Sequence, residues 1–272
     1  MGKNRTLAGM GSDLEIAFAP FVPPPAGATG TVGEFDHSVW GELLQRYIRR
    51  GERPPTGLDY AGFTLADRKA LSDYLMKLQA HGVDGQDRAG QFAFWINLYN
   101  ARTVALVLDH MPVASIRDIN LGGGIRAALL GGPWQAKLMR VAGINLSLDD
   151  IEHGILRRLF RDHRLHFALN CASRGCPSLQ PYAFTGATLE ASLEACAREF
   201  VNSMHGVSIE ARGAVLSSIF DWYRKDFGGS EEALLNSLIP YADPALGDAL
   251  RGTRRIAAYR YDWRLNDQPG SA

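Results

Sequence analysis

The chain has 272 residues, of which 46% are hydrophobic and 21% are charged, so its apolar content is sufficient for a large folded core and argues against a disordered chain. Lysine and arginine together number 29, as do aspartate and glutamate, and the formal net charge is zero. A chain without an excess of one charge sign has no field that attracts nucleic acid, so we expect no nucleic-acid partner. No apolar run approaches the ~18 residues typical of a membrane-spanning helix, so we expect no transmembrane segment.

The composition divides the chain into an N-terminal arm, one domain and a short tail. Residues 1–33 are rich in Gly, Ala and Pro, which predicts an irregular arm. This arm lacks the apolar core of a signal peptide, so we expect a cytoplasmic protein by default, or a periplasmic one if a signal peptide was removed. Residues 34–266 are predicted to form the domain, and residues 267–272 a disordered tail.

Helical spacing of apolar residues predicts three helices in the first half of the domain, over residues 36–50, 65–80 and 88–109. The third is apolar on nearly all sides, which predicts a central, buried helix. It carries Asn97 and Asn100 on one face, and a buried amide without partners costs about 1–3 kcal/mol. We therefore expect these asparagines to hold a neighbouring loop, or one of them to orient a catalytic group.

The second half of the domain mixes short helices and strands. The glycine-rich stretch from Leu121 to Trp134 predicts a connection or lid with a short helix in its middle. Ser147 and Asp150 form an S-x-x-D cap for a helix over DDIEHGILRRLF. The remaining predicted elements are a hairpin over residues 137–148, a strand at 166–169, a helix at 189–204, a hairpin at 207–216, helices at 220–227 and 232–238, and a strand at 256–261. The predicted fold is one mainly helical α+β domain around a small, mostly antiparallel β-sheet.

The segment HFALNCASRGCP, His166 to Pro177, is the predicted functional centre, with Cys171 as its reactive thiol. Cys171 stands where a predicted strand meets a Ser/Gly turn, so partial exposure is expected. Arg174 and free backbone N–H groups in the turn can lower the pKa of such a thiol. The same N–H groups can form an oxyanion hole. The alternative is that Cys171 is a small core residue.

A histidine is the usual base that activates a thiol. His166 lies on the predicted strand that leads to Cys171, but five strand residues span about 17 Å and an odd offset directs the two side chains to opposite faces. His153 lies on the preceding helix, beside Glu152 and one turn after Asp149. We therefore predict His153 as the partner of Cys171, with Glu152 orienting it. The alternative is that His153 is a surface residue that pairs with Asp149.

Two further interpretations use the second cysteine of the segment. Cys171, Cys176, His153 and His166 together supply two thiols and two imidazoles, which is an acceptable zinc set. The C-x4-C spacing is wide for zinc, and no H-x3-5-H pair accompanies it. Alternatively, Cys171 and Cys176 form a short disulfide, either structural or redox-active, which leaves Cys196 as a free thiol.

Four ordered motifs carry a resemblance to a known family. FWINLYNA (94–101), SLDDIEHGILR (147–157), HFALNCASRGCPSL (166–179) and YDWRLN (261–266) resemble the DUF547 family, and the match extends roughly from Phe35 to Asn266. The family has no agreed function. Some members are joined to glutaredoxin-like domains, which implies thiol chemistry by association only. The order of the elements is similar to papain-like and transglutaminase-like folds, although the central helix here carries Trp95 and Asn97 where those enzymes place the cysteine.

Taken together, these observations predict a thiol-dependent acyl-transfer or hydrolytic enzyme that acts on an amide or thioester of a small molecule or peptide. The predicted catalytic residues are Cys171, His153 and Glu152. The predicted positioning residues are Asn97, Asn100, Asn170, His166, Arg174 and Trp95. No cofactor is expected, and a thiol or redox partner is compatible with the two cysteines. The alternatives are a non-catalytic binding or scaffold domain with a structural polar cluster, and a zinc-stabilised domain.

Overall fold

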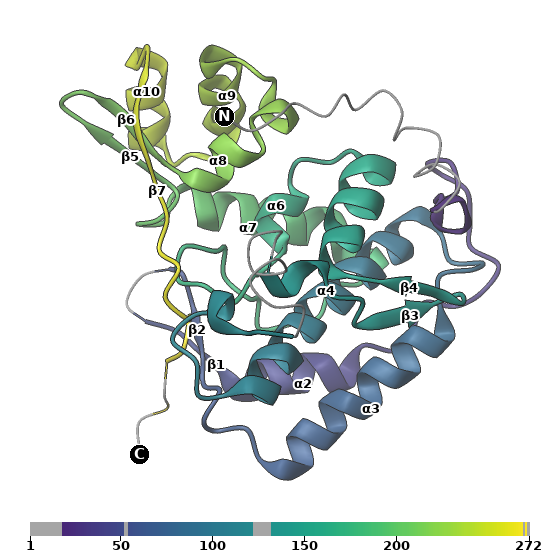
Figure 1. Cartoon of the computed structure of the whole chain (residues 1–272). Helices are drawn as coiled ribbons and strands as arrows, with labels where there is room; N and C mark the ends of the chain where they lie inside the picture. The colour runs from purple at the N-terminus through teal and green to yellow at the C-terminus, as the bar shows by residue number, and fades with distance from the viewer. Residues whose placement is uncertain (1–17, 52–53, 122–131, 269, 271–272) are drawn as a thin grey trace, which may run out of the picture.

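A computed structural model of the protein describes residues 18–51, 54–121, 132–268 and 270. Most of this part of the chain is helical (Figure 1). The α-helices are α2 (Ser38–Tyr47), α3 (Leu65–His81), α4 (Arg88–His110), α6 (Leu165–Ala168), α7 (Leu189–Val201), α8 (Ser218–Trp222), α9 (Glu231–Leu238) and α10 (Pro244–Gly252). A helix with π-type hydrogen bonds, η4, covers Asp150–Phe160. Short 3-10 turns are η1 (Ala19–Phe21), η2 (Ile116–Asp118), η3 (Gly132–Gln135), η5 (Gly186–Thr188), η6 (Arg224–Phe227) and η7 (Ile239–Tyr241).

The strands form three small sheets, which confirms the predicted α+β class. Two are antiparallel pairs, β1 (Ile48–Arg49) with β2 (Gly57–Leu58) and β3 (Met139–Val141) with β4 (Ile144–Leu146). The third has the order β5 (Val207–Glu210), β6 (Gly213–Ser217), β7 (Ile256–Arg260), in which β6 pairs antiparallel with β5 and parallel with β7. This sheet lies beside α8, α9 and α10 at one end of the molecule, and α2 and α3 lie at the other end (Figure 1).

Helix α4 passes through the middle of the fold, as predicted (Figure 1). The side chain of Asp87 caps its first turn and accepts a hydrogen bond from the Gly90 N–H at 2.7 Å. Every residue from Gly90 to Ala101 is buried. A helix that is apolar on all sides is stable only when other elements surround it, and α3, η4 and α7 supply that cover.

The predicted elements around η4 are also confirmed. Ser147 and Asp150 cap each other, with the Asp150 N–H donating to Ser147 Oγ at 3.1 Å and the Ser147 N–H donating to Asp150 Oδ2 at 2.7 Å. The hairpin β3–β4 turns at Ala142 and Gly143, whose φ angles are 48° and 78°. Both angles are in the left-handed region that a two-residue hairpin turn requires.

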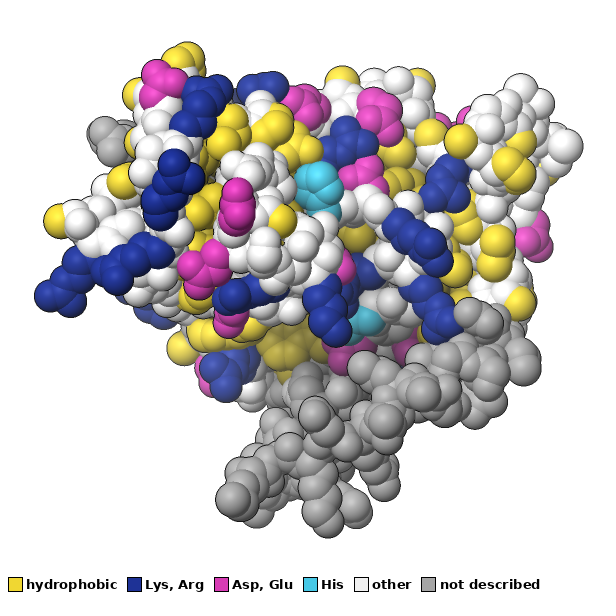
Figure 2. All heavy atoms as spheres, turned by 90° about the horizontal axis from the view of Figure 1, so that it is seen from above, with side chains coloured by type: hydrophobic (Ala, Val, Ile, Leu, Met, Phe, Trp, Pro, Cys, Tyr) yellow, Lys and Arg dark blue, Asp and Glu magenta, His cyan; other side chains and the backbone are white. Residues whose placement is uncertain are grey.

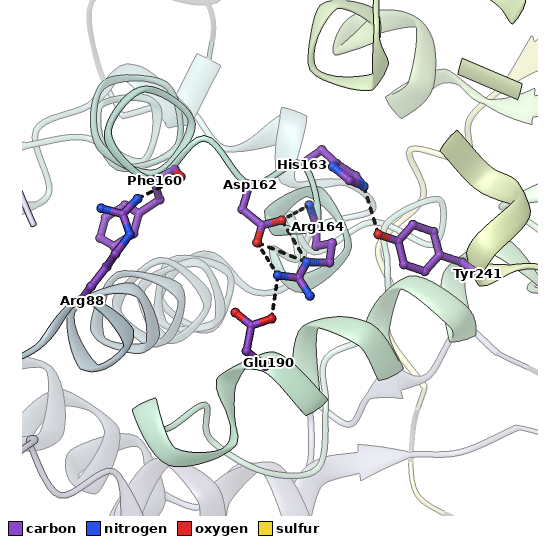
Figure 3. A network of polar contacts seen from close by, with 7 residues as sticks. All are labelled: Arg88, Phe160, Asp162, His163, Arg164, Glu190 and Tyr241. Carbon is purple, nitrogen blue, oxygen red and sulfur yellow. Dashed lines mark hydrogen bonds and ion pairs between the residues drawn. The ribbon is translucent and has the colours of Figure 1, made fainter. Parts of the chain in front are cut away.

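The turn after η4 is fixed by a cluster of polar contacts (Figure 3). Arg164 Nη2 lies 2.6 Å from Asp162 Oδ2 and 2.8 Å from Glu190 Oε2, so one guanidinium joins the turn to the start of α7. His163 Nε2 lies 3.2 Å from the hydroxyl of Tyr241 in η7. These contacts hold the segment that leads into the predicted functional centre.

The predicted strand at residues 166–169 is wrong, because this segment forms the one-turn helix α6. The backbone N–H of His166 donates to the His163 carbonyl at 3.1 Å, and the N–H of Leu169 donates to the Leu165 carbonyl at 3.1 Å. The Asn100 side chain donates to the Ala168 carbonyl and accepts from the Asn170 N–H, so these backbone groups need no neighbouring strand. The opposite-face argument about His166 therefore does not apply.

The two ends of the domain are better packed than the composition predicts. Within the described part of the arm, Phe21 is fully buried and its ring lies 5.0 Å from that of Trp95, edge to face. Asp267 forms a bridge with Leu58, and the Gln268 N–H donates to the Leu58 carbonyl at 3.0 Å, so contacts with the domain extend past residue 266. The short helix predicted within the glycine-rich stretch falls on residues 122–131, outside the described residues. Among the helices described, none combines the length and apolarity needed to cross a membrane.

Candidate functional site

Cys171 and Cys176 form a disulfide in the loop that follows α6. The chain turns sharply between them, and Ala172 has a φ of 61°, which is uncommon for a residue with a side chain. Cys176 is buried, with an exposed fraction of 3%, whereas Cys171 is partly exposed. Cys171 therefore presents the more accessible sulfur of the pair.

Two buried asparagines hold this loop. The Asn100 side chain donates to the Ala168 carbonyl at 2.9 Å and accepts from the Asn170 N–H at 2.9 Å. The Asn170 side chain donates to the Pro177 carbonyl at 2.7 Å and accepts from the Ala172 N–H at 2.8 Å. These bonds satisfy buried backbone groups that water cannot reach. The prediction that Asn100 holds a neighbouring loop is confirmed.

Asn97 has the same kind of role one turn earlier on α4. Its side chain donates to the Phe184 carbonyl at 2.7 Å and accepts from the Phe184 N–H at 3.0 Å. Phe184 lies in the segment between the disulfide loop and α7. The two asparagines of α4 thus fix the chain on both sides of the disulfide loop.

The C-terminal YDWRLN segment lies directly against the disulfide loop. Ser173 and Leu265 form an antiparallel bridge, and the Arg174 N–H donates to the Arg264 carbonyl at 2.9 Å. Gly175 allows the closest approach, since a Cβ atom at this position would lie 2.7 Å from the Asp262 nitrogen. This pairing brings Tyr261 to the disulfide.

The two sulfurs are surrounded by hydrogen-bond donors. The Tyr261 hydroxyl lies 3.0 Å from Cys171 Sγ and 3.1 Å from Cys176 Sγ. The Ser173 hydroxyl lies 3.2 Å and 3.5 Å from the same atoms, and the Cys171 N–H donates to Cys176 Sγ at 3.0 Å. Burial raises the pKa of Tyr261, so its hydroxyl keeps its proton at neutral pH and remains able to donate.

Most of the backbone N–H groups that were predicted to form an oxyanion hole are engaged within the loop or with the C-terminal segment. Their acceptors are Cys176 Sγ for Cys171, the Asn170 side chain for Ala172, the Arg264 carbonyl for Arg174, the Asp262 carbonyl for Gly175 and the Ser173 carbonyl for Cys176. An oxyanion hole built from these groups would require the loop to open.

A second polar cluster surrounds the buried Glu152 of η4. The Tyr99 hydroxyl donates to Glu152 Oε2 at 3.2 Å, and the Tyr223 hydroxyl also hydrogen-bonds to this carboxylate. Burial and the charge of Glu152 together raise the pKa of both tyrosines. The same charge acts on Tyr261, so the Glu152 cluster and the disulfide are electrostatically connected.

His166 belongs to this second cluster and not to the disulfide. Its ring stacks on Tyr223 with centroids 3.9 Å apart, and its Nε2 lies 2.8 Å from Asp226 Oδ2. Arg157 donates two hydrogen bonds to the Asp226 carboxylate, at 2.7 Å and 3.0 Å. Burial lowers the pKa of His166, although Asp226 opposes this effect. Burial alone would raise the pKa of Asp226, but His166 and Arg157 outweigh it and hold that pKa well below its ordinary value.

His153 is on the surface of η4. Its Nε2 lies 4.0 Å from Asp149 Oδ1, its Nδ1 lies 3.2 Å from an Arg157 nitrogen, and its ring packs beside Tyr223. This placement matches the alternative prediction, in which His153 is a surface residue that pairs with Asp149. None of these contacts reaches Cys171, so the structure does not bring the predicted base to the predicted nucleophile.

The two remaining predicted positioning residues, Arg174 and Trp95, make contacts that are typical of structural residues. Arg174 is exposed, and its Nε donates to the Leu265 carbonyl at 3.3 Å. Trp95 is fully buried between Phe21 and Phe94, with ring centroids 5.0 Å from each. Both residues therefore stabilise the packing around the loop, and neither approaches a sulfur through these contacts.

The four residues of the zinc alternative are not gathered in one place. The two cysteines are bonded to each other, His166 binds Asp226 and His153 faces Asp149. Within the described ranges, no group of three or more His, Cys, Asp or Glu side chains is arranged to hold a metal ion. Cys196 is buried in α7, and burial raises its thiol pKa.

Several residues of these clusters were not predicted from the sequence. Tyr99 and Tyr261 lie inside two of the motifs, so their position in a motif was a usable signal. Ser173 lies two residues after Cys171, within its turn. Tyr223 and Asp226 carry no local pattern, because only the tertiary fold places them beside Glu152 and His166.

The comparisons with known proteins agree with the motif-based resemblance. A comparison with curated proteins and one with solved structures found no match, so the likeness to papain-like and transglutaminase-like folds stays a prediction. A family model described as "Protein of unknown function, DUF547" matches residues 83–201, which include α4, η4, the disulfide loop and α7. Over residues 83–201 the chain is therefore similar to the DUF547 family.

Proposed function

We propose that Cys171 and Cys176 form a redox-active pair and that the protein exchanges its disulfide with thiols of other molecules. The observation that carries this proposal is the environment of the Cys176 sulfur. Three groups able to donate a hydrogen bond lie within 3.5 Å of it, namely the Cys171 N–H, the Tyr261 hydroxyl and the Ser173 hydroxyl, and the two hydroxyls also bond each other at 2.7 Å. Hydrogen bonds to a sulfur stabilise its thiolate form and so make it a better leaving group.

The proposed exchange has two balanced steps. A substrate thiolate attacks Cys171 Sγ, a new disulfide forms between substrate and Cys171, and the electron pair of the broken bond leaves on Cys176 as a thiolate. A second substrate thiolate then attacks the substrate sulfur of the mixed disulfide and releases Cys171 as a thiolate. The protein ends as a dithiol after taking up two protons, and two substrate thiols become one disulfide.

The different exposure of the two cysteines supports this assignment of roles. Cys171 is partly exposed and can be reached by a substrate thiol, whereas Cys176 is buried beneath it. The pair closes a loop of only a few residues whose ends are held by Asn100 and Asn170, so the sulfurs stay close together after reduction. Proximity of this kind favours re-formation of the disulfide.

A second candidate function is the thiol-dependent acyl-transfer or hydrolytic reaction on an amide or thioester, with Cys171 as nucleophile. The Ser173 and Tyr261 hydroxyls, 3.2 Å and 3.0 Å from Cys171 Sγ, favour it because they would stabilise a Cys171 thiolate. This reaction requires the disulfide to be reduced first. It also requires a base, and none of the His153 contacts described above reaches Cys171. His153 with Glu152 could therefore act only after a rearrangement.

The experiment that tests the proposed function compares Cys176→Ser with Cys171→Ser in the folded protein. We expect Cys176→Ser to expose a Cys171 thiol that alkylates rapidly and forms mixed disulfides with added thiols, detected by mass spectrometry. We expect the remaining thiol of Cys171→Ser to react at least about tenfold more slowly, because Cys176 is buried. The wild-type disulfide should be reduced by dithiothreitol without denaturant.

Equal reactivity of the two variants, or a wild-type disulfide that is reduced only after unfolding, would contradict the redox proposal. An acyl substrate distinguishes the second candidate function, acyl transfer, from disulfide exchange. A burst of product from a thioester that requires pre-reduced protein and is lost in Cys171→Ser would support acyl transfer in place of disulfide exchange.

A further inference from the structure

Four aromatic side chains form a continuous cluster beside the disulfide. This aromatic cluster consists of Trp134, Trp222, Tyr261 and Trp263. The Tyr261 ring lies 4.6 Å from that of Trp263 and 4.8 Å from that of Trp222, and the two tryptophans stack with centroids 5.5 Å apart. Trp134 lies 6.0 Å from Trp263. The residues come from η3, α8 and the segment after β7, so only the tertiary fold gathers them.

The aromatic cluster is partly exposed to solvent. Trp222 has an exposed fraction of 46%, and the other three side chains are only partly buried. Exposed aromatic rings keep apolar surface in water, and contiguous patches of them mark binding surfaces. Figure 2 shows apolar side chains interspersed with charged ones over the end of the molecule that carries α8 to α10, so this end is not uniformly polar.

One residue joins the aromatic cluster to the disulfide. The hydroxyl of Tyr261 contacts both sulfurs, and its ring packs on Trp222 and Trp263. Tyr261 therefore belongs both to the aromatic cluster and to the surroundings of the two sulfurs. The cluster is placed to hold whatever reacts at the disulfide.

Charge near the aromatic cluster indicates what it would bind. The Arg117 guanidinium lies 5.1 Å above the Trp263 ring. The neighbouring carboxylate of Asp262 is paired with Arg264 at 2.5 Å, so it does not attract a cation. The surface is thus apolar with the Arg117 cation at its edge, which suits an apolar or aromatic segment and disfavours a positively charged one.

We propose that the aromatic cluster docks an extended peptide that carries a cysteine with an aromatic side chain two positions away. This inference rests on the proposed disulfide exchange and names its substrate as a peptide thiol. In an extended chain, side chains two positions apart lie on the same side and about 7 Å apart. With the substrate cysteine at Cys171, such a side chain reaches across Tyr261 to Trp222 and Trp263. A small thiol has no side chain that could pack on these rings.

The test measures how fast matched peptides reduce the wild-type disulfide. Two blocked peptides differ only in having tryptophan or serine two positions from their single cysteine. We expect the tryptophan peptide to react about three- to tenfold faster, as the typical energies of aromatic contacts imply. Glutathione should react more slowly than the tryptophan peptide. Each rate is divided by the rate with dithiothreitol, so that general effects on the disulfide cancel.

The aromatic cluster is then altered. Trp222→Ala and Trp263→Ala should bring the preference for the tryptophan peptide close to one, and Trp222→Phe should restore part of it. Leu65→Ala is the matched control, because Leu65 is 87% exposed at the start of α3 and should leave the preference unchanged. Thermal melting confirms that each variant is folded.

A second measurement separates this inference from the proposed function. A peptide with serine in place of its cysteine cannot react, and its binding to the oxidised protein is followed by tryptophan fluorescence. Binding that is lost in Trp222→Ala supports the docking surface even if dithiothreitol fails to reduce the folded protein. The docking surface is overturned if the two peptides react alike, if their preference survives Trp222→Ala, or if glutathione reacts fastest.

Discussion

The Tyr261 hydroxyl lies 3.0 Å from the Cys171 sulfur, although 90 positions separate the two residues in the sequence. The contact exists because the C-terminal segment returns to pair with the disulfide loop. It puts a protonated phenol where a thiolate would form during reduction. The surroundings of the disulfide therefore include a residue from outside the segment that the DUF547 model matches.

Removal of the Tyr261 hydroxyl should slow the reduction of the disulfide. Tyr261→Phe keeps the ring in the aromatic cluster but removes its one hydroxyl proton, which can reach either sulfur. Hydrogen bonds to charged groups contribute about 1.5–3 kcal/mol, so we expect the dithiothreitol reduction rate to fall by about tenfold or more. Stopped-flow fluorescence measures the rate. Tyr259→Phe removes a hydroxyl two residues away, which bonds Arg224, and serves as control. Rates for Tyr261→Phe within twofold of wild type would rule out a role for the hydroxyl.

Asn100 should be important for stability. Asn100→Ala leaves the Ala168 carbonyl and the Asn170 N–H buried without their partner, and each such group costs about 1–3 kcal/mol. We expect the free energy of unfolding, measured in urea, to fall by about 2–4 kcal/mol. Asn236→Ala, in the exposed face of α9, should change it by less than about 0.5 kcal/mol. An equal effect of both substitutions would contradict the assigned role of Asn100.

Asp226 should contribute a pH-dependent part of the stability. Its pKa in the folded protein is held well below the ordinary value by His166 and Arg157, so its contribution is present above about pH 4 and is lost as the pH falls through the lower folded pKa. At pH 7 we expect Asp226→Asn to lower the free energy of unfolding by about 1–3 kcal/mol. The difference from wild type should narrow below about pH 4.

The control for this prediction is Asp221→Asn. Asp221 pairs with Arg224 on the surface, and exposed ion pairs contribute about 0–1 kcal/mol. Urea unfolding at a series of pH values between 7 and 3 measures both variants. If the Asp226→Asn difference were constant over this range, the proposed linkage to the Asp226 carboxylate would be incorrect.

His37 should make the protein less stable in mild acid. Burial lowers its pKa from 6.5 to about 4, and its Nδ1 lies 2.8 Å from the Tyr74 hydroxyl. A histidine with a lowered folded pKa takes up its proton more readily in the unfolded chain, so stability falls as the pH drops from about 6.5 towards 4. At pH 5 the loss from His37 amounts to about 2 kcal/mol, at 1.36 kcal/mol for each pH unit.

His37→Gln tests this prediction because glutamine can bond to Tyr74 but does not titrate. The variant should lose less stability than wild type between pH 7 and pH 5, measured by urea unfolding. His163 and His166, whose pKa values are also lowered by burial, remain in the variant and leave a smaller residual slope. Identical slopes for the two proteins would show that His37 is not the group responsible.

The local elements of the fold were largely predictable. The buried helix α4, the cap of Ser147 and Asp150 and the β3–β4 hairpin follow from residues a few positions apart, and all three are present. Asn100 was predictable for a related reason, since an amide inside an apolar helix must find partners. The segment at 166–169 was mispredicted because its apolar residues fit a strand and a helical turn equally well, and Asn100 decides between them.

The candidate site was predictable only in part. Cys171 and Cys176 could be selected because cysteines beside a tight turn form a local pattern, and a disulfide between them was one of the interpretations. The sequence selected His153 as the partner of Cys171, because a strand argument excluded His166 and the neighbouring carboxylates favoured His153. In the structure His166 bonds Asp226, His153 faces Asp149, and Tyr261 contacts the sulfurs.

The amino-acid sequence by itself determined a mainly helical α+β domain, its central helix and the cysteine-bearing turn, because these depend on spacings of two to seven residues. Only the tertiary structure decided which side chains surround the sulfurs. Tyr261 contacts the sulfurs, Trp222 packs on Tyr261 and Trp134 packs on Trp263, and no short-range pattern encodes such a meeting of three separate parts of the chain. Burial and charge then act on the assembled groups, so the candidate site around Cys171 and Tyr261 is a property of the folded chain.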